Sequence, residues 1–539
     1  MDGSAVTPID AKSITGKYPE ITRRSQLLVV GAGPAGIAAA LEGARLGLQV
    51  TLVDENPVPG EMMGLDVPQF YGQCMTGAVQ NPGRMVEQIL ATSPGLEAAF
   101  DAGVEVLLGT SVWGAFVNGP AVQSLPGRVA GLADQSQSWL CGFDALVLAT
   151  GARDLVLSFA GIERPGVIGA NAFHALVARY DAFKGRRLVI LGSDTLAIET
   201  AFLALDHGIE VAALVEVRGE PQGSPAAVAA IEARGVAILT RHVIVEATGT
   251  LEGVDAAVVV ALDAGGGARP EGRRVIACDT ICLAIGLVPT VELADVLGCQ
   301  LAARADRGGH VATRDASGQS SVAGVFAVGD CAGPAPDAAA AGAAAARAAA
   351  HWLGVAVPDE PPSPTPDPGN SDTFAYRMDW MRALTATGSP RVLACLCEEV
   401  TRADLLGVKP PRYLDCTSPQ MVARDARSLL ADGPLNHDQF KRLTRASMGP
   451  CQARRCREQV AMLLALASDV PVEAVPLAGY RAPVRPLPLS LLATTGESPA
   501  MTAGWDVWFG IPGQWTPYAD IGTEREVLDD DGSGDSMHL

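Results

Sequence analysis

A glycine turn between an apolar stretch and a helical stretch is the feature that most constrains this chain. Residues 26–30, QLLVV, read as a strand, and the turn that follows carries Gly31, Gly33 and Gly36 in G-x-G-x-x-G spacing. A helical stretch comes next, and residues 49–54, QVTLVD, read as a second strand. Strand, turn, helix and strand in this order predict a βαβ unit, and therefore an α/β fold with a Rossmann-like parallel sheet.

The three glycines have separate physical tasks in such a unit. Gly31 allows the tight turn, Gly33 lets the backbone approach a pyrophosphate, and Gly36 lets helix and strand pack closely. The helix N-terminus offers N–H groups and a positive dipole to the same anion. Asp54 ends the second strand, where a carboxylate accepts hydrogen bonds from an adenosine ribose. The unit therefore predicts a dinucleotide site, with cofactor contacts expected from Gly31, Gly33, Pro34, Ala35, Gly36, Asp54 and Glu55.

A second unit of the same shape occupies residues 186–216, and its turn departs from the pattern. It reads Gly192, Ser193, Asp194, so a carboxylate stands in the position of the middle glycine. A fixed negative charge repels a pyrophosphate, and a side chain at this position blocks close approach. Two interpretations stay open: a retained scaffold without a nicotinamide nucleotide, or a nucleotide in a shifted pose with Glu216 as its ribose ligand.

Composition and charge exclude some classes of partner. The net charge of −20 argues against nucleic acid, whose phosphates need a basic face. Residues 1–24 lack the apolar core of a secretion signal, and no stretch offers the ~18 uninterrupted apolar residues of a membrane span. The alanine-rich run 338–350 contains Arg347 and is expected to be a packed helix. We therefore expect a cytoplasmic protein whose 11 cysteines are free thiols, metal ligands or redox centres.

The length of 539 residues requires more than one hydrophobic core, because single cores stop growing at about 250–300 residues. The second unit lies within the sequence of the first, and a proline-rich stretch then marks a linker. We expect an N-terminal leader (1–24), a first nucleotide domain (25–160 and 310–355), an inserted NAD(P)-type Rossmann-like domain (161–309), a Pro-rich linker (356–375), a cysteine module (376–470) and an extended C-terminal segment with an acidic tail (471–539).

Four cysteines of the module are spaced as two pairs. Cys395 and Cys397 form C-x-C, and Cys451 and Cys456 form C-x4-C. Four thiolates are the number needed for a tetrahedral zinc or for a 2Fe–2S cluster. A C-x-C pair is too tight for a typical zinc knuckle, but it can present both sulfurs from an extended loop at the rim of a cluster. A 2Fe–2S cluster is therefore preferred, with zinc or an unoccupied site as the alternatives.

A helical stretch follows Cys451, over residues 452–467, and its first turn is expected to carry Cys456. Loop amides and the helix N-terminus can then donate hydrogen bonds to the sulfurs and tune a reduction potential. Arg454 and Arg455 add positive charge beside an anionic site.

Two later motifs bear on which dinucleotide is bound. Residues 144–154, DALVLATGARD, and 324–333, GVFAVGDCAG, resemble motifs of the FAD-dependent reductases that have two dinucleotide-binding domains, and the resemblance extends over residues 25–350. It implies FAD, not NAD, in the first site. Cys74 has no C-x-x-C or C-x4-C partner nearby, so disulfide reductase activity is not expected. The resemblance adds Thr150, Gly151, Gly329 and Asp330 to the expected FAD contacts.

The cysteine motifs carry a second resemblance. C-x-C-E-E-V-T, followed by K-x-x-T-R-x-x-M-G-P-C-Q-x-R-x-C, resembles the 2Fe–2S module of bacterioferritin-associated ferredoxin (BFD) type. This version is similar to the module in the A (alpha) subunits of opine (octopine/nopaline) oxidases, hydroxyproline and proline dehydrogenases, and hydrogen cyanide synthase. The resemblance covers residues 25–490 and implies a two-dinucleotide-domain flavoprotein with a small α-rich module. Its metal ligands would be Cys395, Cys397, Cys451 and Cys456.

This resemblance implies an electron-transfer subunit rather than a self-sufficient catalyst. The implied partners are an FAD-containing beta subunit, which oxidises a secondary amino acid at its CH–NH group, and in some assemblies a small ferredoxin-like gamma subunit. FMN at a subunit interface, a nucleotide in the second unit and peripheral membrane association stay open. We expect no catalytic acid or base in this chain. The alternatives are a self-contained NAD(P)H-dependent FAD/2Fe–2S reductase and a non-catalytic scaffold with zinc.

Overall fold

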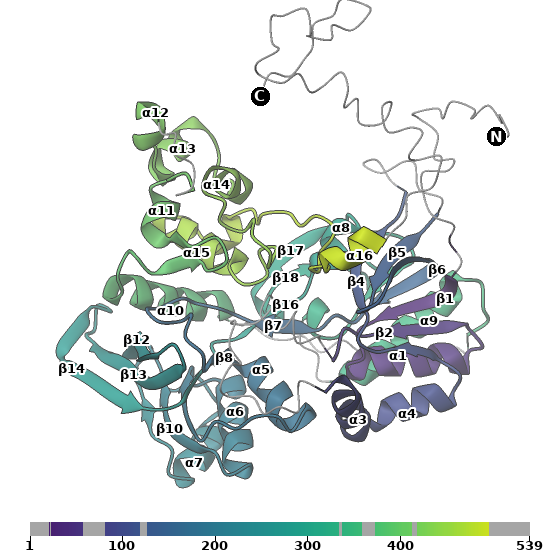
Figure 1. Ribbon diagram of the computed structural model, residues 1–539, viewed down its shortest axis with the longest axis horizontal. Helices are drawn as coiled ribbons and strands as arrows, with labels where there is room; N and C mark the ends of the chain where they lie inside the picture. The colour runs from purple at the N-terminus through teal and green to yellow at the C-terminus, as the bar shows by residue number, and fades with distance from the viewer. Residues whose placement is uncertain are drawn as a thin grey trace, which may run out of the picture.

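Figure 1 shows the computed structural model of the chain, with the first nucleotide unit at one end and the second unit and the cysteine module at the other. Most of the leader and of the Pro-rich linker, the acidic tail and Cys74 lie outside the described residues. The structure describes residue 21 and residues 23–57, 81–118, 127–333, 337–357, 372–411 and 418–494.

The first sheet has the strand order β3-β2-β1-β6-β5-β4, and β19 also pairs with β6. β1 pairs in parallel with β2 and β6, whereas β5 and β4 form an antiparallel extension. Leu27 and Leu28 of β1 are fully buried, as expected for a central strand of a parallel sheet. The strands are β1 (Arg23–Val30), β2 (Val50–Val53), β3 (Glu105–Leu107), β4 (Ser111–Phe116), β5 (Val129–Ala133), β6 (Ser138–Leu148) and β19 (Val325–Ala327).

Helix α1 (Pro34–Arg45) packs against α9 (Ala338–Trp352) beside this sheet (Figure 1). Small residues permit the close approach, because a Cβ at Gly342 would overlap the carbonyl oxygen of Ala35. Ala345 and Ala346 on the same helix are buried, so the alanine-rich run is the packed helix that the sequence predicts. Helices α3 (Pro82–Thr92) and α4 (Pro94–Asp101) complete this unit.

The second unit contains a parallel sheet of order β11-β10-β9-β15-β8 and an antiparallel sheet of order β12-β13-β14. Its parallel strands are β8 (Val167–Gly169), β9 (Arg187–Leu191), β10 (Glu210–Val215), β11 (Ile238–Leu239) and β15 (Thr280–Leu283); the antiparallel ones are β12 (His242–Thr250), β13 (Gly253–Leu262) and β14 (Ala268–Ala277). The helices are α5 (Ala170–His174), the π-helix η3 (Ala175–Arg179), α6 (Thr195–Asp206) and α7 (Pro225–Ala233).

Short elements connect the two units and build the C-terminal module. The connecting elements are β7 (Ala152–Asp154), β16 (Leu287–Pro289), α8 (Glu292–Val296), β17 (Leu301–Arg304), η4 (Ala305–Arg307), β18 (Gly309–Ala312) and η5 (Gly329–Ala332). The module and the segment after it contain α10 (Thr373–Thr387), β20 (Leu393–Cys395), β21 (Val400–Thr401), α11 (Arg402–Leu406), α12 (Pro419–Val422), α13 (Ala426–Asp432), α14 (His437–Thr444), α15 (Arg457–Ser468), η6 (Val472–Ala474) and α16 (Leu489–Thr494). None of the helices described here is long and apolar enough to cross a membrane.

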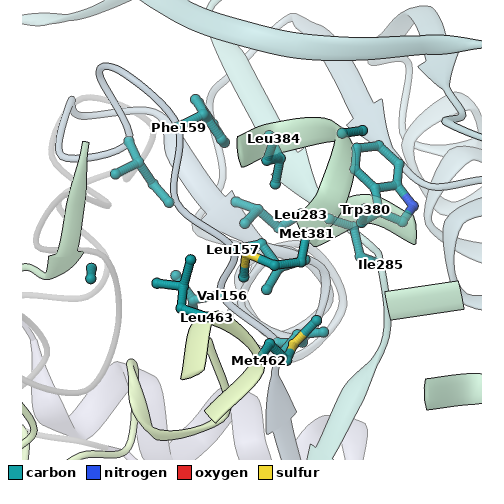
Figure 2. Close-up of a cluster of buried hydrophobic side chains, with 14 of the residues drawn as sticks. Val156, Leu157, Phe159, Leu283, Ile285, Trp380, Met381, Leu384, Met462 and Leu463 are labelled. Carbon is teal, nitrogen blue, oxygen red and sulfur yellow. The ribbon is translucent and has the colours of Figure 1, made fainter. Parts of the chain in front are cut away.

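The C-terminal module shares one hydrophobic core with the second unit. Figure 2 shows Trp380 and Leu384 of α10 and Leu463 of α15 beside Leu283 and Ile285, which belong to the second unit. All of these side chains are buried, and each contributes about 1.5–3 kcal/mol through the apolar surface it removes from water. The module therefore does not stand apart behind its linker; it is packed onto the second unit.

Candidate functional site

The turns that follow β1, β6 and β19 meet at one edge of the first sheet. The strand ends are in register, since Val30 pairs with Leu148 and Leu148 with Ala327. Parallel strands present their C-terminal turns on the same side, so the three sequence motifs come together. Gly31 has φ 107°, and a Cβ there would overlap the Ala149 carbonyl oxygen, so the turn requires glycine.

Gly33 faces open space at the start of α1. A Cβ at this position would meet no atom within 4 Å. Gly33 is the N-cap of the helix, and no side chain caps it. Gly36 is packed instead, because its Cβ would overlap the carbonyl oxygen of Gly31. The turn thus combines room with an uncapped helix N-terminus, which fits the pyrophosphate of a dinucleotide.

Asp54 and Glu55 already have partners within the protein. Asp54 accepts hydrogen bonds from Ala32 N at 2.6 Å and from Asn56 N at 2.8 Å. Glu55 accepts two hydrogen bonds from the Arg485 guanidinium, at 2.7 and 3.2 Å. Local sequence motifs could not reveal Arg485, because it lies far along the chain in the C-terminal segment. The ribose contacts of both carboxylates stay a prediction.

The last two motifs complete this edge. Thr150 Oγ1 donates to the Thr290 carbonyl at 2.8 Å, and a Cβ at Gly329 would lie 3.1 Å from the Ala35 Cβ. Asp330 accepts no side-chain hydrogen bond from another described residue, and burial raises its pKa. The structure brings together all residues predicted to contact FAD, and the contacts themselves stay predicted: Gly31, Gly33, Pro34, Ala35, Gly36, Asp54, Glu55, Thr150, Gly151, Gly329 and Asp330.

In the second unit, the carboxylate of Asp194 caps the helix that a phosphate would otherwise approach. Asp194 is the N-cap of α6 and accepts a hydrogen bond from Ala197 N at 3.2 Å. Burial raises the pKa of Asp194, while the Ala197 N–H and the charge of Arg377 act in the opposite direction. The chain therefore already uses an N–H group that an anion would need.

The acid that would hold a ribose in the second unit is buried under the chain's own helix α10. Glu216 is fully buried, and its carboxylate accepts hydrogen bonds from Ser193 Oγ at 2.6 Å and Tyr376 OH at 2.8 Å. Its other oxygen accepts from Arg218 N at 2.8 Å. Burial raises the pKa of Glu216, and these hydrogen bonds oppose that rise. The ribose position is thus closed by Tyr376, which the sequence analysis missed.

The four predicted metal ligands meet in one buried place. The Sγ atom of Cys395 lies 3.9 Å from that of Cys397 and 3.7 Å from that of Cys456, and Cys397 lies 3.6 Å from Cys451. Cys456 is the N-cap of α15 rather than part of its first turn, because the helix begins at Arg457. Among the described residues, no set of three or more His, Cys, Asp or Glu side chains is a ready-made metal site. Four sulfur donors alone still fit a tetrathiolate group in kind and number.

A positive charge beside these thiols offsets the negative charge that metal-binding thiolates carry. Hydrogen bonds from Cys397 and Cys456 lower the pKa of Cys451 to about 2, and contact with Cys395 raises the pKa of Cys397. Arg455 is nine-tenths buried, and its Nε and Nη2 atoms have no hydrogen-bond partner among the described residues. Burial lowers the pKa of Arg455, and the negative charge of the neighbouring thiolates opposes this.

Arg153 joins the first site to the cysteine loop. It follows the Thr150–Gly151 turn on β7, and its Nε donates to the Arg454 carbonyl at 2.6 Å. Its other nitrogens reach Glu292 Oε1 at 2.8 Å and Glu458 Oε1 at 3.1 Å. Burial raises the pKa of Glu292, but the charges of Arg153, Arg485 and Arg454 together with a backbone hydrogen bond lower it below its ordinary value. A partly buried ion-pair network therefore connects the two candidate sites.

Comparison with known proteins identifies the family. The model of the pyridine nucleotide-disulphide oxidoreductase family matches residues 25–350. The chain belongs to this family. It is 26% identical to the opine oxidase A subunit of Agrobacterium tumefaciens (strain Ach5), over 87% of this chain and 91% of the relative. It is 31% identical to the sarcosine oxidase alpha subunit of Rhizobium meliloti (strain 1021), over 51% of this chain but only 26% of the relative.

A solved structure extends the likeness beyond the family domain. L-proline dehydrogenase from P. horikoshii superimposes with a TM-score of 0.58 over 88% of this chain and 81% of its own, at 19% sequence identity. The resemblance to opine oxidase A subunits predicted from the sequence is confirmed, and so is the Rossmann-like α/β fold. This member of the pyridine nucleotide-disulphide oxidoreductase family has only free thiols among its described cysteines.

Proposed function

We propose that this chain is the electron-transferring flavoprotein subunit of a multisubunit, FAD-dependent amine or imino-acid dehydrogenase (oxidase). A separate FAD-containing beta subunit would oxidise an opine, proline, hydroxyproline or similar secondary amino acid. This chain would receive the electrons and deliver them to a respiratory or dye acceptor. The likeness to the opine oxidase A subunit over most of both chains supports this role.

The first nucleotide site and the cysteine site would each hold one of the two groups that electron transfer needs. The uncapped helix N-terminus at Gly33 would hold the FAD pyrophosphate, and the four cysteine sulfurs would hold the cluster. Bound FAD exchanges one or two electrons and a 2Fe–2S cluster exchanges one, so together they supply a conversion from electron pairs to single electrons. Arg455 would offset negative charge at the thiolates, and burial shields Cys395, Cys451 and Cys456 from water, while Cys397 is half-buried.

The observation that carries the proposal is the Arg153 junction. A flavin site and a four-thiol site could occur in one chain for unrelated reasons. Here a single guanidinium, which is mostly shielded from solvent, binds the backbone of the cysteine loop, at Arg454 O, and two carboxylates of neighbouring elements. A rigid connection of this kind is expected where electrons pass between two sites, because transfer depends on a fixed separation.

The state of the second unit argues against the alternative, a self-contained NAD(P)H-dependent reductase. Asp194 occupies the phosphate end and the Glu216–Tyr376 hydrogen bond closes the ribose end. We therefore expect electrons to come from a partner protein. Anaerobic addition of NADH or NADPH should leave the flavin absorbance unchanged, whereas the complex with its beta subunit should bleach on addition of a secondary amino acid. Rapid bleaching by NADH of the chain alone would favour the reductase.

The identity of the metal is part of the proposal. Sulfurs around one tetrahedral metal at about 2.3 Å lie about 3.8 Å apart, close to the three separations found here. Four thiolates are also the ligand number of a 2Fe–2S cluster, which Cys395, Cys397, Cys451 and Cys456 would hold. The C-x-C spacing and Arg455 favour the cluster, while one zinc per chain would support the scaffold alternative.

A further inference from the structure

A buried serine and a buried histidine form a hydrogen-bonded chain that ends on one of the four cysteines. We propose that Ser447 and His437 tune the electron affinity of the group held by the cysteine site: Ser447 donates a hydrogen bond to the Cys456 sulfur, and His437 donates one to the Ser447 hydroxyl. This inference rests on the proposed function. It assigns two positioning residues that act through the ligand sulfur and not on a substrate.

The geometry of the chain is continuous. Ser447 Oγ lies 3.3 Å from Cys456 Sγ, and His437 Nε2 lies 3.2 Å from Ser447 Oγ. Ser447 is 1% exposed and His437 is 0% exposed, so water does not compete for these contacts. The Nδ1 atom of His437 has no partner among the described residues. Other buried serine hydroxyls near the module, such as Ser158, bond to amides instead.

The chemistry sets the direction of each hydrogen bond. A thiolate that binds metal can only accept, so the Ser447 hydroxyl must donate to Cys456. The hydroxyl oxygen is then free to accept, and the neutral imidazole of His437 must donate to it from Nε2. Burial and the charges of Arg457 and Lys441 lower the pKa of His437 to about 3, against the opposing charge of Glu458. The imidazole is therefore a neutral donor at physiological pH.

The backbone conformation indicates that the hydroxyl itself matters. Ser447 has φ 75°, in the left-handed region that favours glycine. A non-glycine residue there costs about 1 kcal/mol. Glycine would relieve this cost and would also remove the hydroxyl. The chain keeps the less favourable residue at a position whose hydroxyl reaches the Cys456 sulfur.

The expected effect is on reduction potential, because a donor to a ligand sulfur stabilises the more negative, reduced state. Ser447→Gly should lower the ratio of reduced to oxidised cluster at a fixed potential about tenfold, which is about 59 mV for one electron. His437→Phe should shift the midpoint in the same direction through Ser447. The double variant should shift little further than Ser447→Gly alone, because the histidine acts through the serine.

The experiment is a potentiometric titration of the purified full-length chain, followed by EPR, with iron and sulfide content measured in every variant. Electron-nuclear double resonance in H2O and D2O supplies a second readout, since Ser447→Gly should lose an exchangeable proton coupling. Ser389→Gly, which removes an exposed hydroxyl of the same module, is the matched control and should change neither readout. If Ser447→Gly folds poorly, Ser447→Ala and His437→Gln allow the same comparison.

Two failures are distinguishable. An unchanged midpoint in iron-replete Ser447→Gly and His437→Phe would overturn the tuning role and leave the proposed function intact. A wild-type chain that holds zinc or no metal would overturn the cluster in the proposed function and this inference with it.

Discussion

At the scale of single residues, the three glycines of the first turn have different physical reasons: two are needed for backbone packing, and one leaves room for a ligand. Gly31 and Gly36 are required by the fold, because a Cβ on either would overlap backbone oxygen. Gly33 is not required by the fold, because a Cβ there would enter open space. That space is where a pyrophosphate is expected, so the glycine at 33 is explained by a ligand.

Gly33→Ala should therefore leave the fold intact and weaken FAD binding, whereas Gly36→Ala should destabilise the protein itself. We expect a loss of FAD affinity of at least tenfold for Gly33→Ala, with an unchanged unfolding midpoint of the apoprotein. Flavin release on dilution and urea denaturation of apoprotein measure the two effects. Equal flavin retention in Gly33→Ala and wild type would place the cofactor elsewhere.

Asp154 provides a residue-scale test through pH. Burial raises its pKa to about 6 from 3.8, against hydrogen bonds from Asn171 N and Ala172 N. A raised pKa means that the native state binds more protons, so this group lowers stability as pH rises from about 4 to 6. In the wild type, the free energy of unfolding should fall by about 1–3 kcal/mol across that range because of this group, and in Asp154→Asn this fall should be absent. Urea unfolding at pH 4.5 and pH 7 measures the difference, and an unaltered pH profile in the variant would contradict it.

At the scale of elements, the cysteine loop is held by contacts from β7, α8 and α15 that converge on Arg153. Gln459 of α15 adds a second connection: it accepts from Ser158 N at 2.7 Å and donates to the Ala394 carbonyl at 2.7 Å. Cys456 directly precedes α15, and Cys395 follows Ala394 in β20. Their placement therefore depends on side chains outside the cysteine module.

Arg153→Met should keep both cofactors bound but slow electron transfer between them. The variant removes the ion pair of Arg153 with the buried Glu292, whereas Glu458 keeps its ion pair with Arg457 at 3.4 Å. Breaking a buried pair costs at most about 3–5 kcal/mol of stability. Flash or stopped-flow reduction of the flavin, followed by cluster absorbance, measures the internal rate. Arg164→Met is a matched control, because Arg164 also binds backbone carbonyls, at Ala247 and Gly249. Equal internal rates in wild type and Arg153→Met would show that the junction does not control the transfer.

At the scale of the whole molecule, the second nucleotide unit is the surface on which the cysteine module packs. Its ribose acid binds Tyr376 of α10, and its core continues into α10 and α15 (Figure 2). The unit has kept the Rossmann-like sheet while its ligand-facing end is filled by the chain. The cysteine module and the second unit should then unfold as one body.

Trp380→Ala tests whether the cysteine module and the second unit unfold together. Trp380 is fully buried in the shared core, and its truncation should cost about 3–5 kcal/mol. Because the core is common, loss of the charge-transfer absorbance of the cysteine site and loss of circular dichroism should shift together to lower temperature. Two separate transitions, of which only one moves, would show that the module folds independently.

Short sequence motifs predicted the features that depend on residues close together in the sequence. The glycine turns, the alanine helix and the paired cysteines depend on neighbours in sequence, and their spacing carries the information. Tyr376, Arg153 and Arg485 act on residues far along the chain, so a single sequence contains no signal for their partners. Helix α15 begins at Arg457, five residues after the predicted start at 452, because Cys456 is its N-cap and helix ends are set by capping geometry.

The central claim is that one chain joins a flavin to a four-cysteine iron–sulfur cluster. EPR of the purified chain after reduction with dithionite, with iron, acid-labile sulfide, zinc and FAD measured on the same sample, tests it most directly. We predict about two irons and two sulfides per FAD and a spin-½ cluster signal that disappears in Cys451→Ser and Cys456→Ser while FAD stays bound. One zinc per chain, without iron and without that signal, would contradict the claim.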